Sequence, residues 1–508
     1  MKINPIIAID SYKLGHMAMY PKGTQKIYWN LIPRSTKRTE DLFVPEFNDG
    51  KIVAFGMRMS VQEIHDAFET NFFNRPLNEV LDEFTDAILP FVGDNSIEKA
   101  IENVTALHKL GYLPLVFKWL PEGTLVKAGI PLMTGYNTSD IDLSWLPQYL
   151  ETFTSSEVWK RPTAATIARH YRLIAEHYAR ETCDDMSHVP FQCHDFSCRG
   201  MSTFDDAVKT GMGHLTQFVG SDSVHSAFSI KQIYTSAALL AASVPATEHS
   251  VMMLNSVGET ETETFRRLIK QFNKGIVSIV SDTWDFWDTI TNKAKELKDD
   301  ILARQEDSLG LSKVVFRPDT GNPVDVICGT NPHFEGTTLE EKPFHTPEMK
   351  GAVECLWDIF GGTINEKGYK VLNPKVGLIY GDSITPKRAN EIFKRLKAKG
   401  FASSNIVLGI GSFTYQYVTR DALGFAIKAT YAVIDGKGYN VFKAPKTDFN
   451  KNSAKGMLMV YEEDGEIKCK QECTAEEEAS GLLYIGYING VFTEVKPSFD
   501  EIRARAQK

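Results

Sequence analysis

The chain has 508 residues, of which 43% are hydrophobic and 24% are charged, a composition that excludes a disordered or fibrous protein. Its formal net charge of -9 argues against a dedicated nucleic-acid binder. The most apolar stretch, IYTSAALLAASVPA, is too short and too polar to span a bilayer, so we expect no membrane partner. At this length, two or more domains are the default.

Cysteine usage indicates a reducing compartment. The seven cysteines are odd in number and irregularly spaced, which does not fit a disulfide framework. Cys469 and Cys473 lie four positions apart without a second pair or a histidine cluster nearby, so we assign no metal ligand there. The N-terminus lacks a charged segment followed by an apolar one, and we therefore expect a cytoplasmic protein.

The two ends of the chain predict an α+β domain. Residues 1–158 combine strand-like segments (KIYWNLI, LPLVFKWL, GTLVKAGIPLMTGYNT) with an acidic helical region. Near the C-terminus, AIKATYAVIDGKGYNVFKAP reads as two strands around a glycine-containing turn, which is typical of a β-hairpin. We predict that residues 1–158 and 425–508 together form a second domain.

The central residues, 159–424, alternate short apolar runs with helical patterns, as repeated βα units do. Each apolar run is followed by a polar residue or a glycine. In (β/α) barrels the catalytic groups come from the carboxyl ends of several strands, so this α/β pattern predicts an irregular (β/α) barrel with one assembled active site. The residues in these positions are Asp195, Asp222, His249, Asp282, Asp319, Asp382 and Gly411.

Two helices between these runs are clearly marked. RPTAATIARHYRLIAEHYAR has Pro162 near its start and apolar residues at helical spacing. GDSITPKRANEIFKRLKAKG predicts a basic helix that Ser383 or Thr385 caps and Gly400 ends.

The strand-end residues have two readings. Asp282, Asp319 and Asp382 could each be a helix N-cap, the commonest fate of an aspartate after a strand, and capping does not exclude catalysis. A buried, hydrogen-bonded histidine is the usual alternative for His249. Its place in the series favours a catalytic role, next to Glu248.

Two short motifs suit a phosphorylated sugar. Arg317 and Asp319 lie on the same side of an extended segment, where the arginine suits a phosphate and the aspartate suits hydroxyl groups or Mg²⁺. GIGS at 409–412 follows an apolar strand and offers backbone N–H groups to an anion.

Eight motifs stand in order along nearly the whole chain: DSYKLGHMAMYP (10–21), HDFSCRG (194–200), GSDSV (220–224), PATEHS (245–250), VSDTWD (280–285), RPDTGNP (317–323), GD (381–382) and TRD (419–421). In order and spacing they resemble the nicotinamide phosphoribosyltransferases, a type II phosphoribosyltransferase family similar in fold to nicotinate and quinolinate phosphoribosyltransferases. The resemblance implies transfer of the phosphoribosyl group of phosphoribosyl pyrophosphate to nicotinamide, which gives nicotinamide mononucleotide and pyrophosphate in NAD salvage.

The resemblance also implies how the pyridine is recognised. Phe196 would stack on one face of the ring and Tyr12 of a second subunit on the other, within a homodimer with shared active sites. Asp222 would accept a hydrogen bond from the carboxamide, whereas the carboxylate of nicotinate would meet a like charge there.

The phosphate and catalytic contacts follow from the same resemblance. His249 would be phosphorylated by ATP, with Glu248 a candidate for orienting it, and Asp319 would bind ribose hydroxyl groups or a Mg²⁺-linked group beside Asp282. The cofactors implied are therefore Mg²⁺ and ATP. Further substrate contacts would come from Arg199, Ser278, Arg317, Asp382, Gly411, Ser412, Arg420, Lys428, Arg34, Lys443 and Lys451.

Some features depart from the family pattern, and two other functions stay open. Ser412 replaces a glycine of the phosphate cradle, Ala426 stands where a serine is usual, and a segment around 91–110 is extra. Within the class the alternative is a nicotinate phosphoribosyltransferase. From another class, the alternative is a binding or signalling protein that keeps the fold without turnover.

Overall fold

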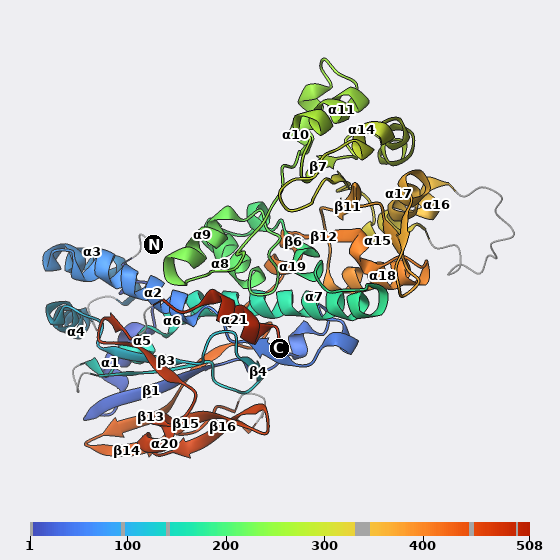
Figure 1. The fold of residues 1–508 in the computed structure, drawn as a ribbon. Helices are drawn as coiled ribbons and strands as arrows, with labels where there is room; N and C mark the ends of the chain where they lie inside the picture. Colours follow the sequence, from blue (N-terminus) through green and yellow to red (C-terminus); the bar gives the residue numbers. More distant parts are fainter. Residues whose placement is uncertain (1–3, 93–96, 139–142, 331–345, 447–451, 494–495) are drawn as a thin grey trace.

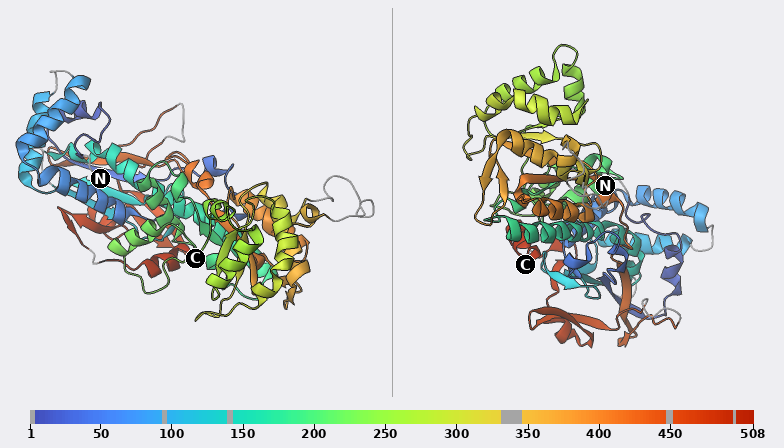
Figure 2. Two further views of the ribbon diagram at one scale, coloured as in Figure 1. Left: turned by 90° about the horizontal axis from the view of Figure 1, so that it is seen from above. Right: turned by 90° about the vertical axis from the view of Figure 1, so that its right-hand side faces the viewer.

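Two sheets with different pairing divide the molecule (Figure 1). The computed structural model describes residues 4–92, 97–138, 143–330, 346–446, 452–493 and 496–508. One sheet is antiparallel and combines the two ends of the chain, and the other is parallel and is made by its central part. In Figure 2 they form separate layers of one elongated body, and α7 (Lys160–Thr182) runs between them.

The terminal sheet has seven strands in the order β14-β13-β1-β5-β3-β17-β18. The pair of β13 and β1 joins distant parts of the chain, since Trp29 of β1 lies opposite Ala429 of β13. Apolar residues of both ends therefore share one core, which includes Trp29, Phe117 and Tyr487. The strands are β1 (Thr24–Ile32), β3 (Leu115–Trp119), β5 (Met133–Asn137), β13 (Ala426–Ile434), β14 (Lys437–Asn440), β17 (Tyr484–Ile488) and β18 (Val491–Phe492).

The predicted C-terminal hairpin is confirmed. β13 and β14 pair antiparallel across Asp435 and Gly436, whose φ values of 48° and 73° are those of a type I′ turn. A second hairpin, β15 (Met457–Glu463) with β16 (Glu466–Cys473), follows it. Short antiparallel pairs elsewhere are β2 (Lys51–Val53) with β4 (Leu125–Lys127), and β9 (Gly362–Ile364) with β10 (Lys370–Leu372).

The parallel sheet has the order β6-β12-β11-β8-β7, and every neighbouring pair in it is parallel. These five strands are five of the seven apolar runs that the sequence marks. The other two runs pair only through isolated bridges, from Ser221 to Asp195, from Gly220 to Ala242 and from Ala246 to Ser278. The parallel α/β core is thus confirmed, while barrel closure stays a prediction. The strands are β6 (Cys193–Asp195), β7 (Val277–Val280), β8 (Val314–Arg317), β11 (Val376–Tyr380) and β12 (Ile406–Ile410).

The two predicted helices are present. In α7 the residues Ile167, Tyr171 and Ile174 are buried against the parallel sheet. In α18 (Pro386–Ala398) the side chain of Thr385 accepts the Arg388 N–H, so Thr385 is the cap, and Gly400 at φ 73° follows the helix.

The remaining helices cover both sheets. In the terminal part they are α1 (Lys13–Met19), α2 (Met57–Phe68), α3 (Leu77–Val92), α4 (Ile97–Leu110), α5 (Leu146–Tyr149), α6 (Glu151–Val158), α20 (Ala475–Ala479) and α21 (Phe499–Ala506). In the central part they are α8 (Phe204–His214), α9 (Val224–Ile233), α10 (His249–Asn255), α11 (Glu261–Gln271), α12 (Phe286–Asp288), α13 (Ala294–Glu296), α14 (Lys298–Leu302), α15 (Pro323–Cys328), α16 (Pro347–Lys350), α17 (Ala352–Phe360) and α19 (Ser412–Gln416).

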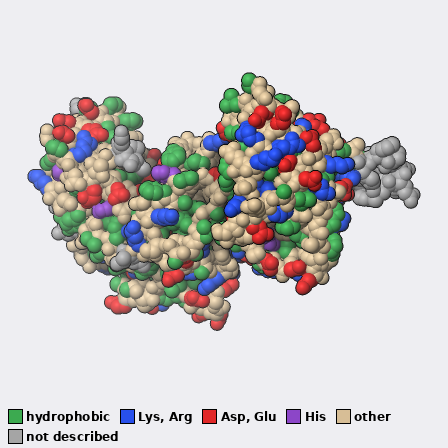
Figure 3. Space-filling view, turned by 45° about the horizontal axis from the view of Figure 1, so that its top comes forward, with side chains coloured by type: hydrophobic (Ala, Val, Ile, Leu, Met, Phe, Trp, Pro, Cys, Tyr) green, Lys and Arg blue, Asp and Glu red, His purple; other side chains and the backbone are tan. Residues whose placement is uncertain are grey.

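The surface carries both signs of charge. Figure 3 shows Lys and Arg side chains interspersed with Asp and Glu side chains over the face it presents. Among the described residues, none of the helices is long and apolar enough to cross a membrane. The predicted domain boundaries at 158/159 and 424/425 stay a prediction.

Candidate active site

Asp282 follows β7 and fixes the loop that follows β8. Its Oδ2 accepts the backbone N–H groups of Asp319 and Thr320, at 2.7 and 2.8 Å, and the Thr320 hydroxyl at 2.8 Å. Its side chain is only 1% exposed. The N-cap interpretation of the three strand-end acids is wrong, because the N-cap residues are Asp285, Asn322 and Thr385. The loops run past each aspartate for a few residues before a helix begins.

His249 is the second partner of Asp282. Its Nε2 lies 3.1 Å from Asp282 Oδ1, and its side chain is 39% exposed. Since a carboxylate accepts, this contact places a proton on Nε2, and the neutral imidazole then has its lone pair on Nδ1. Glu248 does not contact the ring. Its Oε2 lies 4.0 Å from Arg199 Nη1, and its Oε1 accepts the Ser250 hydroxyl at 2.5 Å.

Arg317, at the end of β8, joins an aromatic ring to an acid. Its Cζ lies 4.4 Å from the centroid of the Phe196 ring, and its Nε lies 3.3 Å from Asp319 Oδ1. The expected neighbours Arg317 and Asp319 are therefore in contact, and a guanidinium covers the ring that is expected to stack on a pyridine. Gly381 passes so close that a Cβ there would collide with Asp319 Oδ1.

Asp222 belongs to a three-residue group. Its Oδ1 lies 2.9 Å from His194 Nε2 and accepts the Ser243 hydroxyl at 2.5 Å. Burial acts to raise the pKa of Asp222, but the bonds from His194 and Ser243, with the charge of Arg317, outweigh burial and lower it. His194 also lies against Phe196, with ring centroids 4.6 Å apart. A stable anion thus sits beside an aromatic ring.

The end of β12 and the end of β11 meet at the other side of the site. Gly411 is the N-cap of α19, and a Cβ on it would lie 3.7 Å from Asp382 Oδ1. A Cβ on Gly200 would collide with the Ser412 hydroxyl, so the segment after β6 packs directly on α19. Asp382, Gly411 and Ser412 are therefore close together, as the sequence predicts for strand ends.

Ser278 lies inside β7. It is 5% exposed, and its hydroxyl has no hydrogen-bond partner among the described residues. A buried hydroxyl without a partner costs free energy unless a ligand or water meets it.

A second group of predicted residues lies apart from this site, on the terminal part of the chain. Glu151 is at its centre and receives Lys13 at 2.5 Å and Lys428 at 3.6 Å. Partial burial and nearby carboxylates raise the pKa of Tyr12, and the charge of Arg420 opposes them. We call Tyr12, Arg34, Arg420 and Lys428 the terminal cluster.

Arg34 joins the terminal cluster through its charge. Its Nε donates to the Gly424 carbonyl at 2.9 Å. Burial lowers the pKa of Lys428, Glu151 opposes this shift, and the charge of Arg34 adds to it, so that the pKa is lowered overall. Among the described residues no hydrogen bond, ion pair or ring contact links this cluster to Phe196 or Asp222. The Lys443 side chain is exposed, and Lys451 lies outside the described residues.

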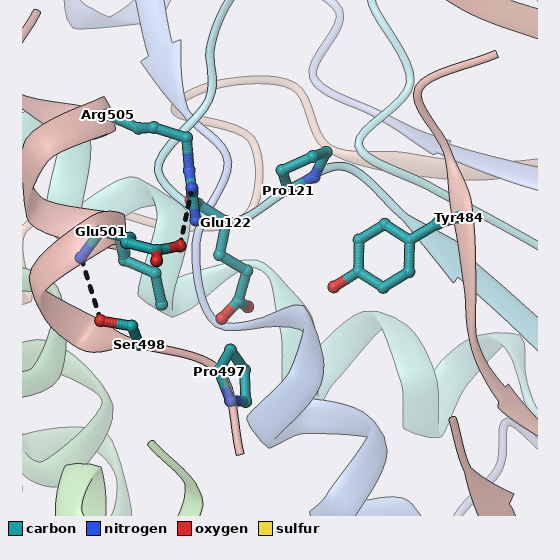
Figure 4. A pocket seen from close by; sticks show the side chains of 8 residues that line it. Pro121, Glu122, Tyr484, Pro497, Ser498, Glu501 and Arg505 are labelled. Carbon is teal, nitrogen blue, oxygen red and sulfur yellow. Dashed lines mark hydrogen bonds and ion pairs between the residues drawn. The ribbon is translucent and has the colours of Figure 1, made fainter. Parts of the chain in front are cut away.

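Two cavities among the described residues lie away from this site. One of about 340 Å³ is lined by Pro121, Glu122 and Tyr484 together with Ser498, Glu501 and Arg505 of the C-terminal segment (Figure 4). Another, of about 450 Å³, borders the starts of α18 and α19. Neither of these two cavities is lined by a predicted catalytic residue. No group of three or more His, Cys, Asp or Glu side chains in the described part could hold a metal ion by itself.

Sequence reasoning missed three residues of this site. His194 has no predicted role of its own, yet it contacts both Asp222 and Phe196. Ser243 and Thr320 each donate a hydroxyl to a site carboxylate. Thr320 follows β8 by three residues and His194 lies next to Asp195 in β6, so their closeness to the strand-end acids was the available signal. Ser243 lies outside the regular strands and had no such signal.

Taken together, the fold and the site define an α/β protein whose acids, histidine and arginine meet at the carboxyl ends of parallel strands. Residues 191–479 match the nicotinate phosphoribosyltransferase (NAPRTase) family. The chain is 45% identical over 507 residues to a protein of Acinetobacter baylyi named nicotinamide phosphoribosyltransferase, covering 99% of this chain and 97% of that one. A protein of the same name from Mycoplasma pneumoniae is 34% identical over 478 residues, covering 89% of this chain and 94% of that one. The chain therefore belongs to the nicotinate phosphoribosyltransferase family.

Solved structures support the same fold. The nicotinate-nucleotide pyrophosphorylase of Pyrococcus furiosus aligns with a TM-score of 0.53 at 15% identity, over 100% of this chain and 96% of that chain. The human nicotinic acid phosphoribosyltransferase aligns with a TM-score of 0.52 at 15% identity, over 98% and 92% of the two chains. At these identities the likeness concerns the fold alone.

Proposed function

We propose that this enzyme transfers the 5-phosphoribosyl group of phosphoribosyl pyrophosphate to nicotinamide, giving nicotinamide mononucleotide and pyrophosphate. The observation that carries the proposal is the Asp222 group. A carboxylate whose pKa is lowered, held by His194 and Ser243 beside the Phe196 ring, accepts from the NH₂ of a carboxamide and repels the carboxylate of nicotinate. The names of the two relatives agree with this choice of substrate.

The other residues suit the charges of the reaction. Breaking the bond between C1 and the pyrophosphate oxygen leaves positive charge on the ribose and negative charge on the leaving group. Asp319, held beside Arg317, offers an anion to the ribose, while Arg199 and Arg317 offer cations to the phosphates. The backbone N–H groups at Gly411 and Ser412 would meet the 5′-phosphate, near Asp382. The hydroxyl of Ser278 is available for the carboxamide.

Mg²⁺ fits this arrangement. Mg²⁺ usually binds through one or two carboxylates together with substrate phosphates, and so it does not need a cage of protein ligands. Asp319 and Asp382, at the ends of neighbouring strands β8 and β11, are the side chains that would face it. When bound, the ion neutralises charge that grows on the pyrophosphate.

We further propose that ATP phosphorylates His249. Asp282 holds the imidazole through Nε2, so that Nδ1 carries the lone pair that would take the phosphoryl group. Asp282 itself is buried and bonded to the loop after β8, which links the state of His249 to Asp319. Glu248 is oriented toward Arg199 instead and is better placed near the phosphates.

We also propose a homodimer with shared active sites. Tyr12 is 62% exposed and lies in the terminal cluster, which has no described contact with Phe196 of the same chain. A second copy could bring this cluster to the site, with Tyr12 on the pyridine and Arg34, Arg420, Lys428 and Lys443 near the phosphates. All seven cysteines are free, which suits work in the cytoplasm.

Steady-state assays with nicotinamide and with nicotinate test the proposal. Pyrophosphate and the nucleotide product are both measured, with wild type and Asp222→Ser. We expect the wild type to prefer nicotinamide and the variant to lose that preference. A wild type that prefers nicotinate, with no change in the variant, would contradict the proposal in favour of the nicotinate enzyme. No pyrophosphate from either substrate would favour the binding protein.

A further inference from the structure

The last residues of the chain bind the backbone of the segments that carry Asp222 and Ser243. We define the C-terminal clamp as residues 497–507, which include α21. The Phe499 N–H donates to the Thr235 carbonyl at 2.7 Å, and the Thr235 N–H donates to the Pro497 carbonyl at 2.9 Å. The clamp therefore pairs with the chain just before residue 236.

Asp500 continues this pairing. Its Oδ2 accepts the N–H groups of Ala237 and Ala238, at 2.7 and 3.2 Å, and its Oδ1 accepts the Ser236 hydroxyl at 2.9 Å. The bond from Ala237 is the largest cause of the lowered pKa of Asp500. Residues 236–238 make no regular strand, so these bonds satisfy backbone donors that no sheet satisfies.

Arg503 supplies the matching donors for carbonyl groups. Its guanidinium donates to Leu215 at 2.7 Å, Leu239 at 2.7 Å and Leu240 at 2.5 Å. The residue is 9% exposed, and Leu215 and Leu240 pack with Phe499 of α21 in one apolar cluster. The Arg503 guanidinium thus connects the segment at Leu215 to the segment at 239–240.

Those two segments lead directly to Asp222 and to Ser243, which bonds it. Beyond Leu215 the chain reaches Asp222, and beyond Leu240 it reaches Ser243. The segments pair through the Ala242 N–H, which donates to the Val219 carbonyl at 2.7 Å, and the Ser221 N–H, which donates to Ala242 at 3.1 Å. The hydrogen bond from the Ser243 hydroxyl to Asp222 then joins the ends of the two segments.

We propose that the C-terminal clamp positions Asp222 against Ser243, and that Asp500 and Arg503 are positioning residues for the choice of amide over acid. The inference rests on the proposed function, because it takes Asp222 to be the amide acceptor. Neither residue touches the site, so each acts through the backbone of 215–222 and 236–243.

The same helix offers a matched control. Arg505 lies on the other face of α21, where it donates to the Glu122 carbonyl at 2.7 Å and lies 3.6 Å from Glu501. Figure 4 shows this face lining the cavity of about 340 Å³, on the side of Glu122 and Tyr484. Arg505 makes no described contact with 215–222 or 236–243.

The experiment compares Asp500→Ala, Arg503→Met and Arg503→Lys with Arg505→Met in the full-length enzyme. For the first two we expect the KM for nicotinamide to rise roughly 2- to 30-fold and the nicotinamide-to-nicotinate ratio of kcat/KM to fall. The KM for phosphoribosyl pyrophosphate should stay unchanged. Arg503→Lys should recover part of the ratio, and Arg505→Met should behave as wild type.

Hydrogen exchange of peptides covering 236–243 adds a readout besides activity. It should speed up in Asp500→Ala and not in Arg505→Met. If Arg503→Met does not fold, Asp500→Ala decides the question. An unchanged ratio and unchanged exchange in Asp500→Ala, with an active wild type, would overturn the clamp alone. A wild type that does not turn over nicotinamide would overturn the proposed function.

Discussion

Asp282 holds His249 with one carboxylate oxygen and the loop after β8 with the other. The half-buried imidazole and the buried acid are therefore directly coupled. A change at the ring, such as a phosphoryl group on Nδ1, would alter the charge that faces Asp282. Asp282 in turn accepts a hydrogen bond from the backbone N–H of Asp319. If His249 is phosphorylated as proposed, this connection would link the phosphorylation to the ribose side of the site.

Replacing His249 separates ATP use from transfer. We expect His249→Ala to abolish labelling of the protein by radioactive ATP and to remove stimulation by ATP, while slow transfer remains. Asp282→Asn should weaken labelling and slow transfer by about 10- to 100-fold, because its NH₂ group cannot accept the Nε2 proton of His249 and its one oxygen cannot serve all the donors that the carboxylate binds. Glu248→Gln, which leaves the contact of Asp282 with the ring intact, is the control for labelling. Label that persists on His249→Ala would show that another residue carries the phosphate.

Asp222 should control substrate choice over a wide pH range. Because its pKa is lowered, the carboxylate stays charged as the pH falls from 8 to 5, and the preference for nicotinamide should persist across that range. In Asp222→Asn the repulsion of nicotinate is lost, and the ratio of kcat/KM values should fall by about 10- to 100-fold. Ratios measured at several pH values check both statements. A wild-type ratio that disappears between pH 7 and 6 would mean that another group sets it.

Sharing of the site between subunits can be tested by mixing inactive variants. Tyr12 and Arg420 lie in the same cluster of one chain, so both should serve the site of the partner. Arg420→Ala mixed with Asp319→Asn should then recover up to about a quarter of wild-type activity, since one site of each hybrid dimer is intact. Arg420→Ala mixed with Tyr12→Ala should recover none, because every hybrid site lacks one of them. Equal behaviour of the two mixtures would contradict a shared site of this form.

Sequence patterns predicted the regular parts of this fold because those parts depend on local chemistry. The turn at Asp435 and Gly436, the cap at Thr385 and the buried face of α7 each need only neighbouring residues, and each is confirmed. Pairing between distant segments is different. Nothing local in KIYWNLI states that β1 lies between β13 and β5, because that order is set by packing over the whole chain.

The site could be predicted only as far as local patterns fix it. Strand ends of a parallel sheet meet, so the contact of Asp282 with the Asp319 loop follows from the pattern. Which residue each side chain contacts does not follow from the pattern. Glu248 adjoins His249 in sequence, yet Asp282 from the end of β7 is the acid that contacts the ring. His194 contacts Asp222 because an isolated bridge between Asp195 and Ser221 brings the segment of Asp222 beside β6.

Glu157 should make the stability of the enzyme depend on pH. Burial, reinforced by Glu63, raises its pKa to about 7, although Lys209 at 2.6 Å opposes the shift and itself also contacts Asp205. A carboxyl whose pKa is raised on folding binds more protons in the folded state, so its contribution is complete below the unfolded value of about 4.3 and is lost as the pH rises toward 7.

Glu157→Gln removes this titration. We expect the free energy of unfolding of wild type to fall by on the order of 1–3 kcal/mol between pH 5 and 7 relative to the variant. Urea midpoints measured at pH 5, 6 and 7 check the slope. Glu176→Gln, at a partly buried acid on α7 with two arginine partners, is the control and should follow wild type. Parallel slopes for wild type and Glu157→Gln would mean that Glu157 stays charged beside Lys209 throughout this range.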